Sequence, residues 1–188
     1  MGQIKIPPPV KLIVGIISAF PELFKEAEKE LNHKLGLVDY CSPIFPFMHT
    51  DYYKKEMGEN LQRMFISFQE LIFPESLPAI KIFTNKIEER FFYPHEKRRR
   101  LNLDPGYISA AKLVLASTKD HRQRIYLGKG IYGEITLRYE NKKFLPWEWT
   151  YPDYRTEEYR AVFETIRGKY RQQLNESGEG EKLHDIEE

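Results

Sequence analysis

The chain has 188 residues, with 29 Lys and Arg against 28 Asp and Glu, so its formal net charge is only +1. This length fits one domain, and a hydrophobic share of 41% is enough to build a core. The single cysteine, Cys41, excludes an internal disulfide. The longest uncharged apolar run, Leu12 to Phe20, is nine residues long, which is too short to span a bilayer. Because the N-terminus also lacks a signal-peptide pattern, we expect a soluble cytoplasmic protein that does not bind membranes.

The near-neutral total hides an uneven distribution of charge along the chain. The segment 81–124 holds 11 basic and 5 acidic residues, a net of +6, centred on Lys97–Arg100. The segment 175–188 holds six acids and one base, a net of −5, and cannot bury apolar surface. We therefore expect a single α+β domain over 1–174 followed by a disordered acidic tail. The basic segment would attract phosphate groups, although an exposed loop that keeps the protein soluble is an equally good interpretation.

Apolar periodicity and turn residues predict an alternation of strands and helices in the first half of the chain. Val10–Ser18 is short, β-branched and almost continuously apolar, as in a buried strand. Pro21 suits the first turn of a helix, and Gly36 suits its end. The elements that follow are a strand over Leu37–Phe47, a loop or short helix over Phe47–Glu59, a strand over Leu61–Phe73 and a helix over Leu77–Phe92.

The second half begins with a predicted strand, Leu101–Tyr107, that we expect to be broken at Asp104-Pro105-Gly106. Ala110–Ser117 fits a helix capped by Ser109, and it fits a strand nearly as well. The last predicted elements are a hairpin of Arg124–Leu127 and Glu134–Tyr139 and a helix over Thr156–Leu174.

The first six predicted elements run strand, helix, strand, strand, helix, strand. That order is typical of the ferredoxin-like βαββαβ arrangement, in which two helices cover one face of an antiparallel sheet. The elements after it would form a C-terminal helix–hairpin–helix extension. The sequence therefore predicts an α+β domain with this topology.

Three short patterns resemble nucleotide- or RNA-binding sequences but lack the context that would make them functional. Gly128–Gly133 fits G-x-G-x-x-G, yet it joins two predicted strands, and the other protein-kinase motifs are absent. Asn85–Glu88 approximates the guanine-reading N-K-x-D element, yet the chain has no phosphate loop of the form G-x-x-x-x-G-K-[ST]. Phe65 and Phe68 point to opposite faces of their strand, whereas an RNA-recognition domain needs both on one face. We therefore expect neither kinase nor GTPase chemistry.

The densest run of residue types that carry chemistry lies between residues 102 and 126. Asp104, at a predicted strand end, is suited either to anchor a metal-bridged phosphate or to accept backbone hydrogen bonds in a turn. His121 is a candidate acid or base. The five histidines show no metal-site spacing, so we predict no metal site, and the sequence identifies no cofactor. The candidate ligand-binding residues are Asp104, Tyr107, Lys112, Lys119, Asp120, His121 and Arg124, with phosphate attraction by Lys97, Arg98, Arg99 and Arg100.

Two functions stay open at this point. The first is binding of a phosphate-bearing ligand, a nucleotide or RNA, through the 102–126 cluster and the basic segment, and the sequence does not decide whether a reaction is catalysed. The second is an interaction module without catalytic activity that docks a protein partner through the aromatic stretch 147–154. Trp147, Trp149 and Tyr151 share one face if that stretch is extended, although such residues also serve to close a core.

Several motifs together resemble a known bacterial and archaeal family, the domain-of-unknown-function family DUF4416. The resemblance rests on Leu103–Tyr107, Lys112–Asp120 and Arg124–Leu127, and further on Gly130–Glu134, Trp149–Tyr154, Thr50–Tyr53 and Met57-Gly58. It covers most of the chain up to the last predicted helix. Members of this family are often labelled GTP-binding proteins, but the residues above give that label no mechanism, and the family supplies no catalytic residues to carry over.

Overall fold

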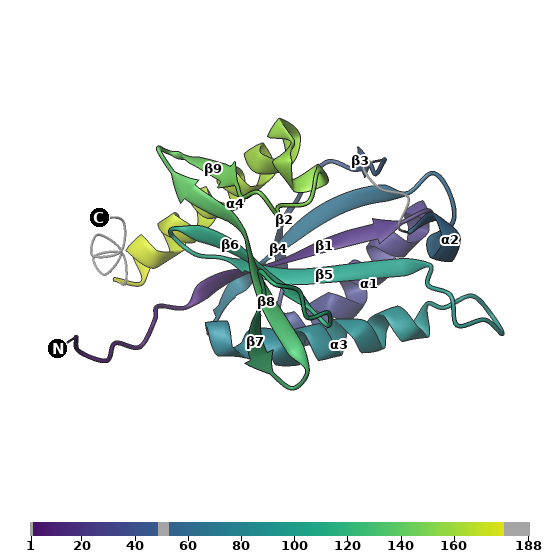
Figure 1. Ribbon diagram of the computed structural model, residues 1–188, viewed down its shortest axis with the longest axis horizontal. Coiled ribbons are helices and arrows are strands. Elements are labelled where there is room, and N and C mark those ends of the chain that lie inside the picture. The colour runs from purple at the N-terminus through teal and green to yellow at the C-terminus, as the bar shows by residue number, and fades with distance from the viewer. Residues whose placement is uncertain (1, 49–52, 179–188) are drawn as a thin grey trace.

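The computed structural model describes residues 2–48 and 53–178. Within these ranges the chain forms a mixed α+β structure with one nine-stranded antiparallel sheet and four α-helices (Figure 1). No helix of the described chain combines the length and the apolar composition needed to cross a membrane. Residues 49–52, at the centre of the predicted loop, and 179–188, most of the predicted tail, lie outside the described residues.

The sheet runs in the order β2-β4-β1-β5-β6-β8-β7, with the short β3 paired to β4 and β9 paired to β8. Its strands are β1 (Val10–Ser18), β2 (Val38–Cys41), β3 (Phe45–Pro46), β4 (Gln62–Ile72), β5 (Leu101–Ile108), β6 (Lys112–Ser117), β7 (Ile125–Gly128), β8 (Ile131–Glu140) and β9 (Lys143–Pro146). The α-helices are α1 (Pro21–Leu35), α2 (Lys54–Met57), α3 (Leu77–Arg90) and α4 (Glu157–Glu176), and the 3₁₀ turns are η1 (Pro74–Ser76) and η2 (Asp153–Arg155).

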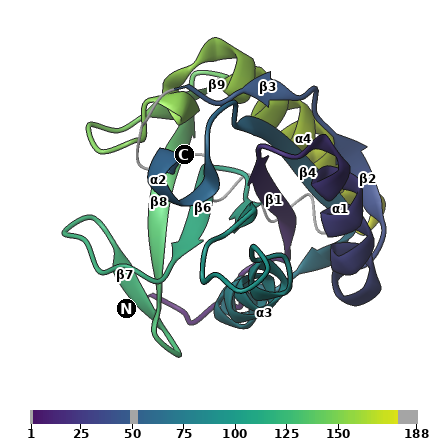
Figure 2. The same ribbon diagram turned by 90° about the vertical axis from the view of Figure 1, so that its right-hand side faces the viewer.

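The central strand β1 is buried on both of its faces, which explains its almost continuously apolar sequence. Leu12, Val14 and Ile16 belong to one core cluster with residues of α1 and α3. Ile13 points the other way and packs with Phe65 of β4 against α4. Figure 2 shows α3 and α4 on opposite sides of the sheet. The sheet is therefore the middle layer of the structure.

The long helices begin and end where the sequence predicts. Pro21 stands at the start of α1, and Gly36 follows its end with a positive φ of 88°, a conformation that suits glycine. Thr156, with which the predicted last helix begins, caps α4: its side chain accepts a hydrogen bond from the backbone N–H of Tyr159. The predictions for β1, α1, α3 and α4 are confirmed to within two residues.

Two sequence predictions about strands were wrong in detail. The predicted strand Leu37–Phe47 is divided into β2 and β3, because Pro43 lies between them and cannot donate a ladder hydrogen bond. The predicted break at Asp104-Pro105-Gly106 does not exist, and β5 passes through these residues. Pro105 is tolerated there because the pairing of β5 with β6 begins only at Gly106.

Ala110–Ser117 is not a helix, because Lys112–Ser117 forms strand β6. Leu113 and Leu115 pack toward α4, whereas Val114 and Ala116 join a cluster with Leu77 at the start of α3. Both faces of this strand are buried, so its apolar run carries no period of two that would identify it. The described chain after β5 therefore forms four strands, β6 to β9, followed by helix α4. It is not a helix–hairpin–helix extension.

Strands β5 and β6 approach each other closely at one end and separate at the other. Their pairing covers only Gly106–Ile108 with Leu113–Leu115, whereas β6 pairs with β8 along its whole length. At the close end there is no room for a side chain on Gly106. A Cβ built on it would lie 2.3 Å from the carbonyl oxygen of Val114. Beyond this point the sheet opens between Asp104 and Ser117.

Gly106 is therefore a site where a single methyl group should damage the fold. We expect Gly106→Ala to lower the free energy of unfolding by about 2–3 kcal/mol, because the backbone of β6 must move to accept the Cβ. Gly168→Ala is the matched control, since a Cβ at this exposed α4 position meets no atom within 4 Å. The control should raise stability by about 0.5–1 kcal/mol. Urea denaturation of both variants tests the pair, and equal effects would contradict the close approach of β5 and β6.

Candidate functional site

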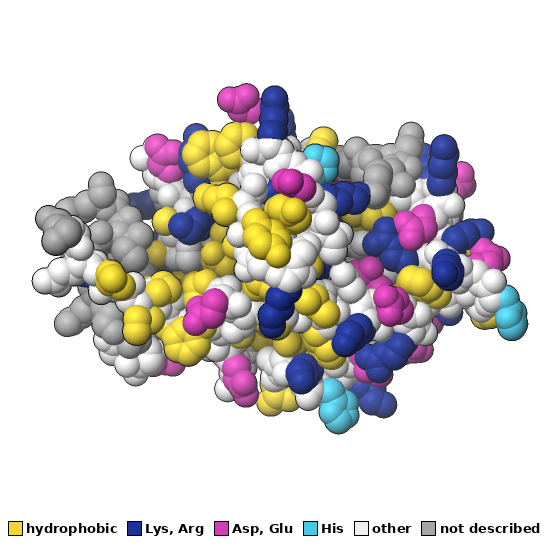
Figure 3. Space-filling model, turned by 60° about the horizontal axis from the view of Figure 1, so that its bottom comes forward, with side chains coloured by type: hydrophobic (Ala, Val, Ile, Leu, Met, Phe, Trp, Pro, Cys, Tyr) yellow, Lys and Arg dark blue, Asp and Glu magenta, His cyan; other side chains and the backbone are white. Residues whose placement is uncertain are grey.

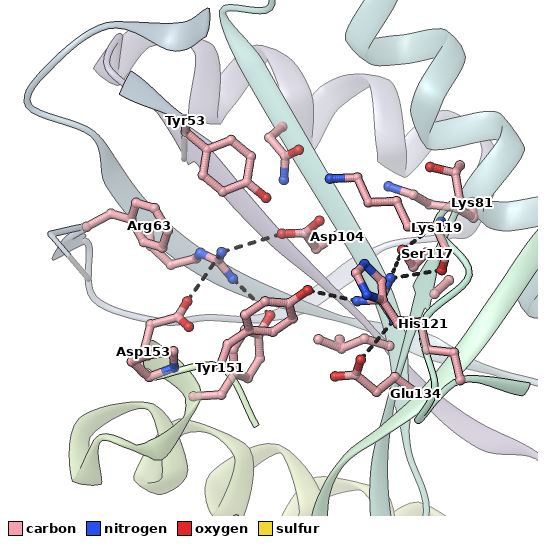
Figure 4. Close-up of a pocket in the computed structure, with 18 of the residues that line it drawn as sticks. Tyr53, Arg63, Lys81, Asp104, Ser117, Lys119, His121, Glu134, Tyr151 and Asp153 are labelled. Atoms are coloured by element: carbon pink, nitrogen blue, oxygen red, sulfur yellow. Dashed lines mark hydrogen bonds and ion pairs between the residues drawn. The ribbon is translucent and has the colours of Figure 1, made fainter. Parts of the chain in front are cut away.

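A cavity of about 710 Å³ lies where β5 and β6 separate, on the sheet face that also carries α4 (Figure 4). Helix α4 covers one part of this face, and a cluster of Ile17, Phe47, Met57 and Leu61 covers another. Phe47 of that cluster lines the cavity, and no residue of α4 does. The cavity walls come from the segment before α2, from α3, from the segment between α3 and β5, from β4, β5 and β6, from the β6–β7 loop, from β8 and from the 151–154 stretch. The residues that line it include Tyr53, Arg63, Lys81, Arg99, Asn102, Asp104, Ser117, Lys119, His121, Arg124, Glu134, Tyr151, Asp153 and Tyr154.

The floor of the cavity is built around Arg63 of β4, whose side chain is only 3% exposed. Its guanidinium donates to the Tyr154 hydroxyl at 2.8 Å and pairs with Asp104 at 3.4 Å and with Asp153 at 3.5 Å. The rings of Phe47 and Tyr154 also lie within 5.4 Å of it. Burial alone lowers the pKa of Arg63, but Tyr154, Asp153 and Asp104 together raise it above its ordinary value. The charge is therefore retained inside the protein.

The sequence makes room for this guanidinium at one position of the neighbouring strand. Gly15 of β1 pairs with Phe65 of β4 on one side and with Asp104 of β5 on the other. A Cβ at Gly15 would lie 3.2 Å from Nη1 of Arg63. Because directly paired residues point to the same face, Asp104 is presented on the cavity side of the sheet. An otherwise apolar β1 thus leaves space for a polar cluster.

A second wall is a network of charges that joins α2, α3 and the start of β5. Arg99 donates to both carboxylate oxygens of Glu56, at 2.7 and 2.6 Å, and to Asn102 at 2.6 Å. Glu88 of α3 accepts from the backbone N–H of Leu103 and pairs with Arg99 at 3.3 Å. Burial raises the pKa of Glu88, although its cationic neighbours oppose that shift. This network fixes Asn102 and the polypeptide on either side of it.

Arg124 organises the corner of the cavity opposite Arg63. Its guanidinium donates to Glu134 and to Ser117 at 2.8 and 2.7 Å, to the carbonyl oxygen of Lys119 at 2.9 Å and to the Tyr151 hydroxyl at 2.7 Å. The side chains of Arg124 and Glu134 are only 4% and 2% exposed. One guanidinium therefore holds together the end of β6, the loop after it, β8 and the 151–154 stretch.

Three lining side chains carry buried polar atoms that have no hydrogen-bond partner among the described residues. These atoms are Nε of Arg63, Nδ2 of Asn102 and Oε1 of Glu134. An unsatisfied buried polar atom is costly, and each one requires a reason. Their concentration around one cavity is consistent with partners that a ligand or ordered water supplies.

The structure brings five of the sequence-predicted site residues to this cavity. Asp104 projects into it from β5, and Lys119, His121 and Arg124 line it from the loop after β6. Arg99 is the member of the basic run that reaches it. In Figure 4 Asp104 lies between Tyr53, Arg63 and Lys119, with His121 on the facing side.

The other predicted site residues lie elsewhere. Tyr107 packs in the cluster on the α3 face, Lys112 stands at the far end of β6 opposite Arg138, and Asp120 is exposed outside the lining. Arg98 lies over Tyr93 and pairs with Glu96, while Arg100 lies over Phe20. Lys97 is exposed.

The space-filling view in Figure 3 shows Lys and Arg side chains gathered in its right half, with Asp and Glu side chains interspersed among them. The basic segment is thus compensated locally by acids such as Glu22, Glu56 and Glu96. The run Lys97–Arg100 does not present four unopposed cations to a ligand.

The aromatic stretch 147–154 is used largely within the protein. Trp147 and Trp149 stack on each other with centroids 5.1 Å apart, both are half-buried, and Trp149 donates to the carbonyl oxygen of Ile135. Tyr154 is buried against Phe65 and Phe163. The stretch therefore closes the core and supplies one wall of the cavity.

Sequence reasoning missed Arg63, Glu134, Asp153 and Tyr53. A charged residue inside an apolar strand, such as Arg63 beside Met64–Phe68, is a usable signal, because arginine is almost never buried without partners. Tyr53 carried no signal at all. Burial and the nearby Asp104 raise its pKa, so its hydroxyl stays protonated. Among the described residues no group of three or more His, Cys, Asp or Glu side chains converges as a metal site would require.

The buried pair of Arg124 and Glu134 predicts a specific pattern of stability. We expect Arg124→Met to lower the free energy of unfolding by about 3–5 kcal/mol, because it leaves the Glu134 carboxylate buried without its counter-ion. Adding Glu134→Leu should restore most of that loss, since a buried pair replaced by apolar side chains is often neutral. Chemical denaturation measures both. A loss under about 1 kcal/mol in the single variant would show that the pair behaves as an exposed one.

Comparison with known proteins identifies the chain by family. A family model described as a domain of unknown function, DUF4416, matches residues 8–170. This match includes every residue that lines the cavity and every strand of the sheet. No curated protein and no solved structure matches the chain. The match covers far more than half of the sequence, and the chain therefore belongs to the DUF4416 family.

Proposed function

We propose that the cavity between β5 and β6 binds a small phosphate-bearing molecule of the nucleotide class. The observation that carries this proposal is the convergence of Lys119, His121 and Arg124 with Arg99 and Lys81 in one enclosed space. Five Lys and Arg residues line it, against the three carboxylates of Asp104, Glu134 and Asp153. Clefts lined by an excess of one charge concentrate ligands of the opposite charge.

The exposed nitrogen-bearing side chains at the mouth are the groups best suited to contact phosphate oxygens. The side chains of Arg124 and Lys81 are only 4% and 8% exposed, and that of Arg99 is 21% exposed. Lys119 and His121 are exposed on the loop between β6 and β7. We therefore place the phosphate at Lys119 and His121, where lysine acts as a compact positive charge.

The size and walls of the cavity favour a nucleotide over RNA. Cavities that bind small molecules and cofactors measure roughly 300–1,000 Å³, and this one measures about 710 Å³. Tyr53 and Tyr151 provide aromatic surface for a planar ring. Recognition of single-stranded RNA instead needs an open groove that follows the backbone over several nucleotides.

The alternative function, protein docking through residues 147–154, has less support. Of the aromatic residues in that stretch, Tyr151 is exposed, and its hydroxyl is held by Arg124 at the rim of the cavity. Trp147 and Trp149 are stacked on each other rather than spread over the surface. A patch made for a partner would expose more of this apolar area.

Titration calorimetry with ribonucleoside diphosphates, inorganic pyrophosphate and a short single-stranded RNA tests the proposal. We expect saturable nucleotide binding that Lys119→Ser weakens about 10- to 100-fold, the range for one hydrogen bond to a charged group. Lys86→Ser, an exposed lysine on α3 outside the cavity, is the matched control and should bind as the wild type does.

Variants of the basic run separate the two ligand classes. Lys97→Ser/Arg98→Ser should leave nucleotide binding unchanged, because neither residue lines the cavity. Strong RNA binding that this double variant abolishes, with no nucleotide binding by the wild type, would favour RNA and overturn the proposal.

We also infer that β1, α1, β2, β4, α3 and β5 form a ferredoxin-like unit to which the remaining elements are added. The order β2-β4-β1-β5, with every pairing antiparallel, supports this inference. So does the packing of α1 and α3 in the same core cluster. In that description the cavity lies at the junction between the unit and the added strand β6.

A further inference from the structure

Three carboxylates line the cavity, and they differ in how they are held. Asp153 and Glu134 are 7% and 2% exposed and face Arg63 and Arg124 respectively. Asp104 is 23% exposed, and its one contact among the described residues is the 3.4 Å approach of its Oδ2 to Arg63. Asp104 is therefore the carboxylate that the cavity presents to a ligand.

The surroundings of Asp104 fit a ligand group that donates hydrogen bonds. The Arg63 cluster that it belongs to holds one guanidinium and two carboxylates, so this end of the cavity carries a net charge of −1. A phosphate placed between these two carboxylates would meet like charge, whereas Lys119 and His121 reach the cavity from the loop between β6 and β7. The cavity is thus polarised, and it orients a ligand that is anionic at one end and donor-bearing at the other.

Two oxygens of one carboxylate can accept two parallel hydrogen bonds from adjacent donors. Oδ1 of Asp104 has no partner among the described residues, and the contact of Oδ2 is longer than a good charged hydrogen bond. On a nucleotide, adjacent O–H donors occur on the ribose 2′,3′-diol, and N–H donors occur on the amino edge of a base. Both groups are separated from the phosphate, as the polarised cavity requires.

We propose that Asp104 determines the specificity of this site by accepting hydrogen bonds from a pair of O–H or N–H donors on the ligand. The proposal rests on the nucleotide-binding function proposed above and adds to it the orientation and the recognised group. The phosphate end lies at Lys119 and His121. The donor-bearing end lies at Asp104, between the Arg63 cluster and the ring of Tyr53.

The decisive variant is Asp104→Asn, which keeps the shape of the side chain and removes its charge and one acceptor. We expect it to weaken the tightest-binding ribonucleoside diphosphate at least 10-fold by calorimetry while pyrophosphate binding stays unchanged or improves. Loss of selectivity with retained pyrophosphate binding is a readout that a merely structural defect does not produce. Thermal melting without ligand shows that the variant is folded.

Asp153→Asn is the comparison for the loss of one carboxylate beside Arg63. It should lower the melting temperature at least as much as Asp104→Asn does, because Asp153 is the more buried partner. The ratio of nucleotide to pyrophosphate affinity should stay as in the wild type. If Asp153→Asn changes that ratio as much as Asp104→Asn does, the effect belongs to the Arg63 cluster as a whole, and the assignment to Asp104 is wrong.

A series of ligands distinguishes the two sources of donors. If 2′,3′-dideoxynucleotides lose affinity in the wild type and not in Asp104→Asn, the carboxylate contacts the ribose. If affinity instead depends on the amino groups of the base in the wild type alone, it contacts the base. Nucleotide binding that Asp104→Asn leaves unchanged overturns this inference and leaves the proposed function standing. If the wild type binds neither nucleotides nor pyrophosphate, both this inference and the proposed function are overturned.

Discussion

The buried guanidinium of Arg63 is the constraint around which this part of the protein is arranged. Removing such a group from water costs several kcal/mol unless charges and hydrogen bonds replace the hydration. Asp104, Asp153 and Tyr154 provide these partners from β5 and from the 153–154 turn. Strand β4, which carries Arg63, strand β5 and the 153–154 turn are far apart in the sequence. The buried charge of Arg63 requires these three segments to meet at one place.

Other features of the sheet follow from that requirement. Gly15 leaves the space that the guanidinium occupies, and Gly106 lets β6 approach β5 at one end only. If the two strands paired along their full length, Asp104 would lie beside a neighbouring strand rather than at the edge of a cavity. Arg124 lies on the other side, where it connects Ser117 at the end of β6 to Glu134 and Tyr151. Two buried arginines thus border the opening of the sheet.

The sequence predicts elements well where one local pattern decides them. The helix at Pro21–Leu35 has a proline start, an apolar stripe and a glycine stop, and all three agree. Asp104-Pro105-Gly106 has the composition of a turn, yet its glycine serves a close strand approach and its proline stands where the ladder is incomplete. For Lys112–Ser117, burial of both faces removes the periodicity that separates strand from helix. These outcomes depend on tertiary contacts that no local window contains.

The cavity residues also depend on tertiary contacts that the sequence does not show. The structure gives a new interpretation to the strongest sequence signal, the basic excess in 81–124. The excess of basic residues in 81–124 suggests an exposed patch, because charge is ordinarily found at the surface. In the structure Lys81, Arg99, Lys119 and Arg124 from this segment all line the cavity, while Arg98 and Arg100 lie over aromatic rings outside it. The counter-charges Glu56 and Glu134 and the buried Arg63 come from outside the segment, so composition counted along the chain could not pair them. A concentration of cations in sequence therefore corresponds here to the wall of one cavity, and in our proposal the carboxylate of Asp104 sets the selectivity of that cavity.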